Sequence, residues 1–176
     1  MDWLFAPLAL LGLCLIHLLG QVFPALYRAM ALQPRRRNIW QIATYHWVHG
    51  SASHLFFNIL ALGILSTLIV TQLQEQIVPV TILILMVAGW GTWLFSSADR
   101  VAGASGLVFG YWGFILTAAA ISGEPRWTAV AALTLLFYSG LWATLGKVVK
   151  GISWSGHFWG LAGGVLAASL MLLDAH

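Results

Sequence analysis

Charged side chains are scarce in this sequence. Of 176 residues, eight are lysine or arginine and five are aspartate or glutamate, whereas 60% are hydrophobic. A soluble domain of this size cannot cover its surface with so few charges, so the composition predicts a membrane protein. The net charge of +3 comes without a basic run interleaved with aromatics on a polar face. We therefore expect the lipid bilayer, and no nucleic acid, among the chain's partners.

Cysteines and membrane-embedded acids are also lacking. The single cysteine, Cys14, excludes a disulfide scaffold and a CxxC metal site. Every acidic residue lies at a terminus or between apolar runs, which excludes paired-aspartate proteases, HExxH metalloproteases and carboxylate-based transporters. Chemistry must then come from histidine, serine, asparagine and backbone groups, and we expect no cofactor and no metal. The acidic residues are Asp2, Glu75, Asp99, Glu124 and Asp174.

Long apolar runs, by contrast, fill the chain. Six of them are long enough, or nearly so, to cross a bilayer, and backbone groups in lipid must be satisfied internally. This predicts an all-α polytopic membrane bundle of six transmembrane helices, in a single domain over residues 1–176. The first run lacks a basic leader and a cleavage site, so we expect a retained helix. The runs are Leu4–Phe23, Ala52–Gln72, Ile77–Phe95, Ser105–Ser122, Trp127–Gly146 and Gly156–Leu173.

Two connections between these runs have unusual composition. The connection from Pro24 to Ser53 is long and contains Trp40, Tyr45 and Trp47, which favours a structured loop at the membrane interface. The apolar segment 101–104 follows a charged pair, which predicts a chain that dips below the surface before the fourth helix. Such backbone is tolerated only where it is buried in protein or lines a wet cavity.

A first polar motif opens the second run. His54 and Asn58 lie four residues apart and so share one face of a helix, and polar groups in membrane helices normally face the bundle interior. Taken alone, the pair favours hydrogen bonding between helices. His46 and His49 lie upstream, so a metal-binding histidine cluster is a second alternative. The lack of a nearby acid or thiol argues against it.

A second motif, Gly103-Ala104-Ser105-Gly106, precedes the fourth helix. A serine at a helix N-terminus has an unpaired backbone amide and a favourable dipole for a developing oxyanion. The flanking glycines allow other backbone or a substrate to approach closely. Gly106 and Gly110 alone are equally typical of helix packing.

A third motif places His157 beside a glycine stripe at the start of the sixth run. Gly156, Gly160 and Gly164 repeat at four-residue spacing, which is typical of a close helix contact. The fourth and sixth helices run parallel in a six-span serpentine. If their glycine stripes pack together, Ser105 and His157 meet at the same depth.

Such a pair would form a catalytic dyad. A serine hydroxyl needs a base to take its proton, and neutral imidazole is the usual partner. No acid is available to orient His157, so the sequence predicts a dyad and not a triad. His54, Asn58 and the amide of Ser105 would then donate hydrogen bonds to the oxyanion.

The three motifs, their order and the long first loop resemble the rhomboid family of intramembrane serine proteases. The resemblance covers nearly the whole chain. It implies Ser105 as nucleophile, His157 as general base, and His54, Asn58 and the Ser105 amide as the oxyanion hole. The residues in supporting positions are His49, Gly103, Gly106, Phe109 and Gly160.

Two positions depart from the family pattern. Many rhomboids carry a tyrosine that stacks on the catalytic histidine, where this chain has Phe109, and we expect the stacking to survive. The first loop often carries a Trp-Arg pair, here Trp40-Gln41, which predicts looser anchoring of that loop.

The resemblance implies cleavage of peptide bonds in or near transmembrane segments of membrane proteins. Substrates would enter between the second and fifth helices, beside Phe137, Tyr138 and Trp142. Processing of C-terminal membrane anchors is a narrower version of this activity. The alternative is a catalytically idle rhomboid-like protein that binds or escorts membrane clients. A channel or transporter is a further alternative, but the sequence shows no pore-lining pattern that would support it.

The basic residues favour one membrane orientation and the resemblance favours the other. All but Arg126 lie in or beside loops one, three and five, which the positive-inside rule places in the cytoplasm. The family resemblance implies a multi-pass protein of the bacterial inner membrane with both termini in the cytoplasm. The sequence predicts no oligomeric state.

Overall fold

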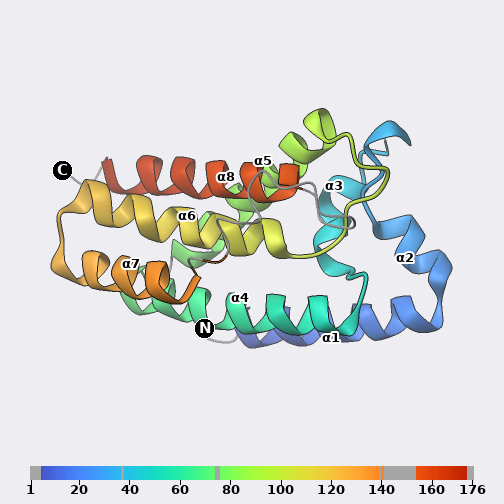
Figure 1. Cartoon of the computed structure of the whole chain (residues 1–176), viewed down its shortest axis with the longest axis horizontal. Coiled ribbons are helices and arrows are strands. Elements are labelled where there is room, and N and C mark those ends of the chain that lie inside the picture. Colours follow the sequence, from blue (N-terminus) through green and yellow to red (C-terminus); the bar gives the residue numbers. More distant parts are fainter. Residues whose placement is uncertain (1–4, 37, 74–75, 139, 141–153, 174–176) are drawn as a thin grey trace.

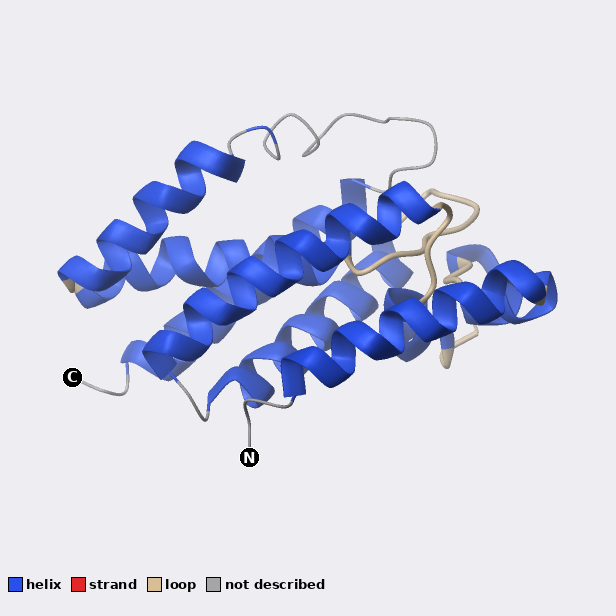
Figure 2. Cartoon of the chain, turned by 90° about the horizontal axis from the view of Figure 1, so that it is seen from below, coloured by secondary structure: helices blue, strands red, loops and turns tan. Residues whose placement is uncertain are grey.

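A computed structural model describes residues 5–36, 38–73, 76–138, 140 and 154–173, and their regular structure is helical (Figures 1 and 2). Ten helical elements lie in these ranges. The α-helices are α1 (Phe5–Val22), α2 (Pro24–Met30), α3 (Gln41–Thr44), α4 (Ala52–Leu73), α5 (Ile77–Phe95), α6 (Ser105–Ser122), α7 (Pro125–Tyr138) and α8 (Trp154–Leu173). Two short 3-10 helices, Pro34–Arg36 and Tyr45–Trp47, complete the first loop.

Four of these helices are long and apolar enough to cross a membrane, namely α4, α5, α6 and α8. The described part of α1 contributes a shorter apolar helix, Leu8–Val22. Of the expected fifth span, Trp127–Gly146, α7 covers the part to Tyr138, and residues 141–153 lie outside the described ranges. The all-α membrane bundle is therefore confirmed, while the count of six spans stays a prediction.

Helix α6 is the centre of the bundle, with α4, α5, α7 and α8 packed around it (Figure 1). It is apolar on every side, as expected of a helix surrounded by other helices. Its aromatic residues Phe109, Trp112 and Phe114 are buried. Because α6 is packed against these four helices, the position of its first residue, Ser105, is fixed in the bundle.

The first loop is folded, as its aromatic content predicted, and sits at the end of the bundle where α6 and α8 begin (Figure 1). Leu32 pairs with Val101 in an antiparallel bridge, with hydrogen bonds of 2.9 and 2.8 Å. Gln41 is buried, accepts from the amide of Gln33 at 2.9 Å and donates to the carbonyl of Ala29 at 3.0 Å. Gln41 thus makes two hydrogen bonds inside the loop, and the looser anchoring expected from glutamine at this position stays a prediction.

Candidate active site

The segment that leads into Ser105 requires glycine at position 103. Gly103 has φ of 119°, a conformation that side chains with a Cβ rarely adopt. A methyl group there would also lie 2.6 Å from Cε1 of His54. The chain can therefore turn into α6 beside His54 only with glycine at this position.

The first loop anchors the same segment through two hydrogen bonds. The amide of Gly103 donates to the carbonyl of Tyr45 at 3.0 Å, and the amide of Ala104 donates to Nε2 of His49 at 3.2 Å. Accepting at Nε2 requires neutral imidazole. Burial, helped by the neighbouring histidine His54, lowers the pKa of His49 to about 3. His49 thus stays neutral and able to accept at physiological pH.

The structure brings Ser105 and His157 together. His157 Nε2 lies 3.0 Å from Ser105 Oγ, although the two residues are 52 positions apart in the chain. Ser105 is half-buried and His157 is buried. The ring of Phe109 stacks on the imidazole, with centroids 4.3 Å apart and planes at 20°. Phenylalanine therefore retains the stacking that the resemblance assigns to tyrosine.

Glycines allow the contact between Ser105 and His157, because they let the backbones of α6 and α8 touch. A methyl group at Gly160 would overlap the carbonyl oxygen of Gly106, and one at Gly164 would overlap that of Gly110. The two glycine stripes predicted to face each other do so. Their contact sets the depth at which Ser105 meets its partner.

His54 and Asn58 lie on the other side of the segment before Ser105. The amide of His54 donates to Ser51 Oγ at 3.1 Å, a capping bond that begins α4. Asn58 is buried, and its Nδ2 has no hydrogen-bond partner among the described residues. A methyl group at Gly103 would lie 3.5 Å from that Nδ2. Because buried amides normally have a partner, Asn58 presents a donor that an added ligand could use.

Sequence reasoning missed how Tyr45 contributes and what His49 binds. Tyr45 acts through its backbone carbonyl, which no side-chain pattern reveals. The acceptor role of His49 depends on a contact across 55 positions of chain. Within the described ranges, no group of three His, Cys, Asp or Glu residues could hold a metal ion.

Fold and site together define a multi-pass helical membrane protein in which a serine at one helix end meets a histidine from a parallel helix. The family follows from comparison with known proteins. The model of the Rhomboid domain matches residues 36–174, well over half of the chain. The chain belongs to the rhomboid family, and it is an integral, multi-pass membrane protein.

Relatives occur in bacteria and plants. An uncharacterized protein of Mycobacterium tuberculosis (strain ATCC 25618 / H37Rv) is 29% identical over 170 residues, covering 90% of this chain and 70% of the relative. An uncharacterized protein of Mycobacterium leprae is 29% identical over 143 residues, covering 76% of this chain and 56% of the relative. The RHOMBOID-like protein 4 of Arabidopsis thaliana is 29% identical over 147 residues, covering 78% of this chain and 35% of the relative.

Proposed function

We propose that this chain is an intramembrane serine protease of the bacterial inner membrane. It would cleave peptide bonds in or near the transmembrane segments of membrane proteins. The observation that carries the proposal is the 3.0 Å contact between His157 Nε2 and Ser105 Oγ. Membership of the rhomboid family supports the same reaction class.

In the proposed mechanism, Ser105 Oγ attacks the substrate carbonyl while its proton passes to Nε2 of neutral His157. The resulting imidazolium then protonates the leaving amine as the peptide bond breaks. Water, deprotonated by His157, attacks the acyl-enzyme ester and releases the second product. Phe109 holds the imidazole plane from one face throughout.

The negative charge of each tetrahedral intermediate needs donors close to the attacked carbonyl. Ser105 is the first residue of α6, where a backbone amide has no partner within the helix. Asn58 contributes its unpaired Nδ2, and the ring of His54 lies beside the same segment. We assign these three groups to the oxyanion hole, where the loss of one donor commonly costs about 100- to 1,000-fold in rate.

A substrate helix must unwind before Ser105 can reach a carbonyl, because helical backbone carbonyls are already paired. Residues that weaken helices near the cut, with a small residue just before it, would help. We place access between α4 and α7. There α4 exposes Phe56 and Phe57, and α7 exposes Phe137. Tyr138 ends α7 and is half-buried, and Trp142 lies outside the described residues.

A fluorophosphonate probe tests the nucleophile directly in membranes containing the full chain. We expect labelling of the wild type, none of Ser105→Ala, and strongly reduced labelling of His157→Ala. Ser169→Ala is the matched control, because Ser169 is a half-buried serine of α8 whose hydroxyl donates to the carbonyl of Val165 at 2.9 Å. Cleavage of a transmembrane reporter should follow the same order.

Equal labelling of the wild type and Ser105→Ala would reject Ser105 as nucleophile. Absence of labelling in a folded wild type would favour the idle, client-binding alternative. Labelling without cleavage of any transmembrane reporter would indicate a hydrolase with another substrate class.

A further inference from the structure

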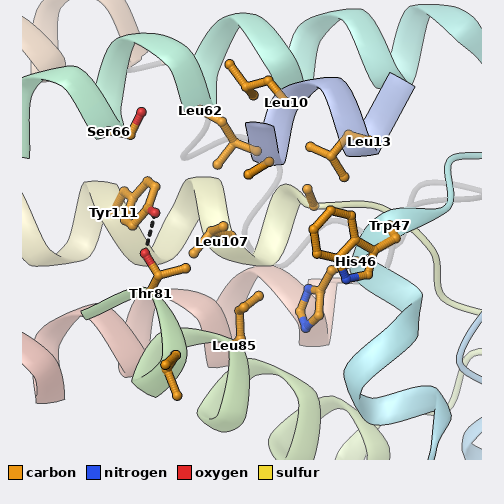
Figure 3. Close-up of a pocket in the computed structure, with 13 residues that line it drawn as sticks. Leu10, Leu13, His46, Trp47, Leu62, Ser66, Thr81, Leu85, Leu107 and Tyr111 are labelled. Carbon is orange, nitrogen blue, oxygen red and sulfur yellow. Dashed lines mark hydrogen bonds between the residues drawn. The ribbon is translucent and has the colours of Figure 1, made fainter. Parts of the chain in front are cut away.

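A cavity of about 240 Å³ lies beside α6, and neither Ser105 nor His157 lines it (Figure 3). Four helices and the first loop form its walls. Leu13 comes from α1, Leu62 from α4, Leu85 from α5 and Leu107 from α6, while Trp47 belongs to the 3-10 helix of the first loop. The proposed protease mechanism uses none of these five side chains.

The walls of this cavity offer no charge and little polarity. Thr81 and Tyr111 share a hydrogen bond of 2.6 Å (Figure 3). Ser66 donates to the carbonyl of Gly63 at 3.3 Å. At the end near the first loop, burial lowers the pKa of His46 to about 3 and so keeps it neutral. A polar or charged ligand would lose hydrogen bonds to water here without replacing them. The cavity therefore suits an apolar occupant.

The cavity lies along α6, a helix long and apolar enough to span a membrane, and has an exposed rim. Tyr111 is six residues into α6, which places it about 9 Å below Ser105 along the helix. Ile82 lines the cavity and is 57% exposed, and α1 exposes Leu8 and Leu11. In a membrane, the medium that meets these apolar side chains is lipid acyl chains.

The volume of the cavity further limits which apolar ligands can fit into it. An α-helix with its side chains is about 10–12 Å wide, and drug-sized ligands need about 300–1,000 Å³. A flexible single hydrocarbon chain needs less width than either. We propose that this cavity binds one acyl chain of a membrane phospholipid. Since Ala104 and Leu107 line the cavity, the chain packs against residues on both sides of Ser105.

Photolabelling tests this site independently of any protease activity. The full chain is reconstituted in phosphatidylcholine vesicles in which a fraction of the lipid carries a diazirine on one acyl chain. After irradiation, we expect label on the cavity residues Leu62 and Tyr111, which are at most 5% exposed. Label will also appear on outward residues such as Leu11.

The variant Ala9→Phe places a ring in the cavity from α1, and should remove most of the label at Leu62 and Tyr111. Leu11→Phe, on the exposed side of the same helix, is the matched control and should leave that label unchanged. If thermal unfolding shows that Ala9→Phe does not fold, Ser66→Leu fills the cavity from α4 instead.

Label confined to outward residues would overturn the proposal. So would label at Leu62 and Tyr111 that persists in the folded cavity-filling variant. Displacement of that label by a transmembrane substrate peptide would assign the cavity to substrate and reject a lipid site.

Discussion

At the scale of single residues, the imidazole of His157 is oriented without help from a membrane-embedded acid. Every acidic residue of the chain lies at a terminus or in a connection. In the proposed dyad the face of Phe109, with its centroid 4.3 Å from that of the imidazole, restricts the ring. An aromatic face restricts the plane of an imidazole through contacts that involve none of its nitrogens. Phe109 supplies this stacking without the hydroxyl that a tyrosine would carry.

Substitution of Phe109 tests this role. Stacked aromatic pairs contribute about 0.5–1.5 kcal/mol beyond their buried area. If the stacking is realised in the transition state, Phe109→Leu should lower reporter cleavage about 2- to 12-fold. Phe109→Tyr keeps the face and should remain within about twofold of the wild type. Equal cleavage by all three proteins would show that stacking does not orient the base.

The hydrogen bond from Ala104 to His49 predicts a pH dependence of stability. The pKa of His49 is about 3 in the folded protein, against an ordinary value of 6.5. Between these values the unfolded chain binds a proton that the folded chain does not, so stability falls as pH decreases below about 6.5. We expect thermal unfolding from about pH 8 to about pH 4 to show this decline.

In His49→Asn the decline should be shallower, because one group of depressed pKa is gone. Some slope remains, since burial also lowers the pKa of His46 to about 3. The variant should be less stable at neutral pH, and an unpaired buried amide at Ala104 would cost about 1–3 kcal/mol. A pH profile parallel to the wild type would contradict the neutral acceptor role of His49.

A contact of the site could be predicted only where a short stretch of sequence carries a signal for it. Ser105 and His157 were predictable because glycine spacing reports a close helix contact within one short stretch. The two hydrogen bonds donated by the backbone amides of Gly103 and Ala104 could not be predicted. They join the first loop to the start of α6 across more than fifty residues, and one acceptor is a backbone carbonyl.

At the scale of helices, the contact between α6 and α8 controls the distance between the Ser105 hydroxyl and the His157 imidazole. The glycines of α8 are not equivalent, although they read as one stripe in the sequence. Gly160 and Gly164 have no room for a side chain. At Gly156, by contrast, a methyl group would meet Thr92 Oγ1 at 3.7 Å, an ordinary contact. The structure therefore distinguishes positions that spacing alone cannot.

The variants Gly160→Ala and Gly156→Ala exploit this difference. Gly160→Ala must push α8 away from the backbone of Gly106, and overpacking of this kind costs about 1–3 kcal/mol or more. We expect a lower melting temperature and the loss of most fluorophosphonate labelling. Gly156→Ala should retain both properties. Similar losses in the two variants would show that the contact depends on helix flexibility and not on close approach.

Hydropathy predicted most helix boundaries, because membrane spans are set by the length of apolar runs. The predicted span Ser105–Ser122 coincides with α6, and Ile77–Phe95 coincides with α5. Inside the first loop hydropathy carries little information. The short helices α2 and α3 are held there by contacts such as Gln41 with the carbonyl of Ala29. Those contacts depend on folding of the whole loop.

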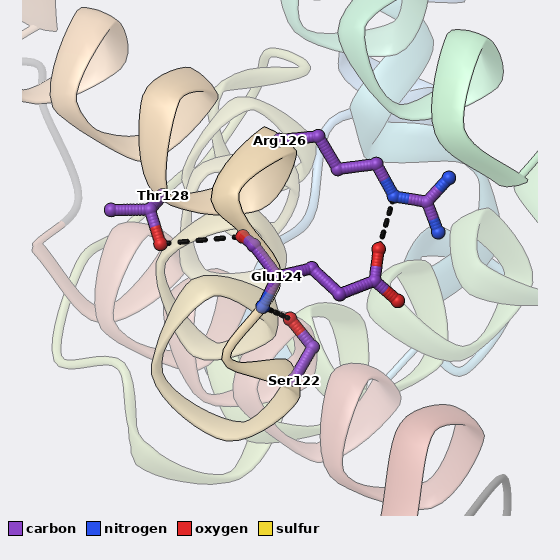
Figure 4. Close-up of polar contacts among 4 residues, drawn as sticks. All are labelled: Ser122, Glu124, Arg126 and Thr128. Carbon is purple, nitrogen blue, oxygen red and sulfur yellow. Dashed lines mark hydrogen bonds and ion pairs between the residues drawn. The ribbon is translucent and has the colours of Figure 1, made fainter.

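At the scale of the whole molecule, charge gathers at the end of the bundle that holds the dyad. Arg35 pairs with Asp99 at 2.9 Å between strongly exposed side chains, so the pair adds little stability. Arg100 lies over the ring of Tyr27, 5.9 Å from its centroid. The α6–α7 turn carries Arg126, which pairs with Glu124 (Figure 4). Two basic residues at the dyad end, Arg35 and Arg100, thus contact partners within the protein.

We predict that the dyad end faces the outside of the cytoplasmic membrane, in the orientation implied by the family. Cys14 is the single cysteine, so Cys14→Ser provides a background for cysteine mapping. In intact cells, an impermeant maleimide should label Asn38→Cys in the first loop but not Arg126→Cys in the α6–α7 turn. Disruption of the membrane should expose both.

Both positions have exposed side chains, so accessibility within the protein does not limit the reaction. The reverse pattern would mean that the basic residues set the orientation and that substrates are cut from the cytoplasmic side. Labelling of both positions in intact cells would indicate a mixed population.

The separation of 52 residues between Ser105 and His157 also bears on biogenesis. Ribosomes add about 5–20 residues per second, so a nascent chain contains Ser105 for about 3–10 s before His157 is synthesised. During that interval α6 can enter the translocon and the bilayer without a base beside it. For the protease proposed above, this order of synthesis means that no neighbouring membrane protein can be cut until α8 has been inserted.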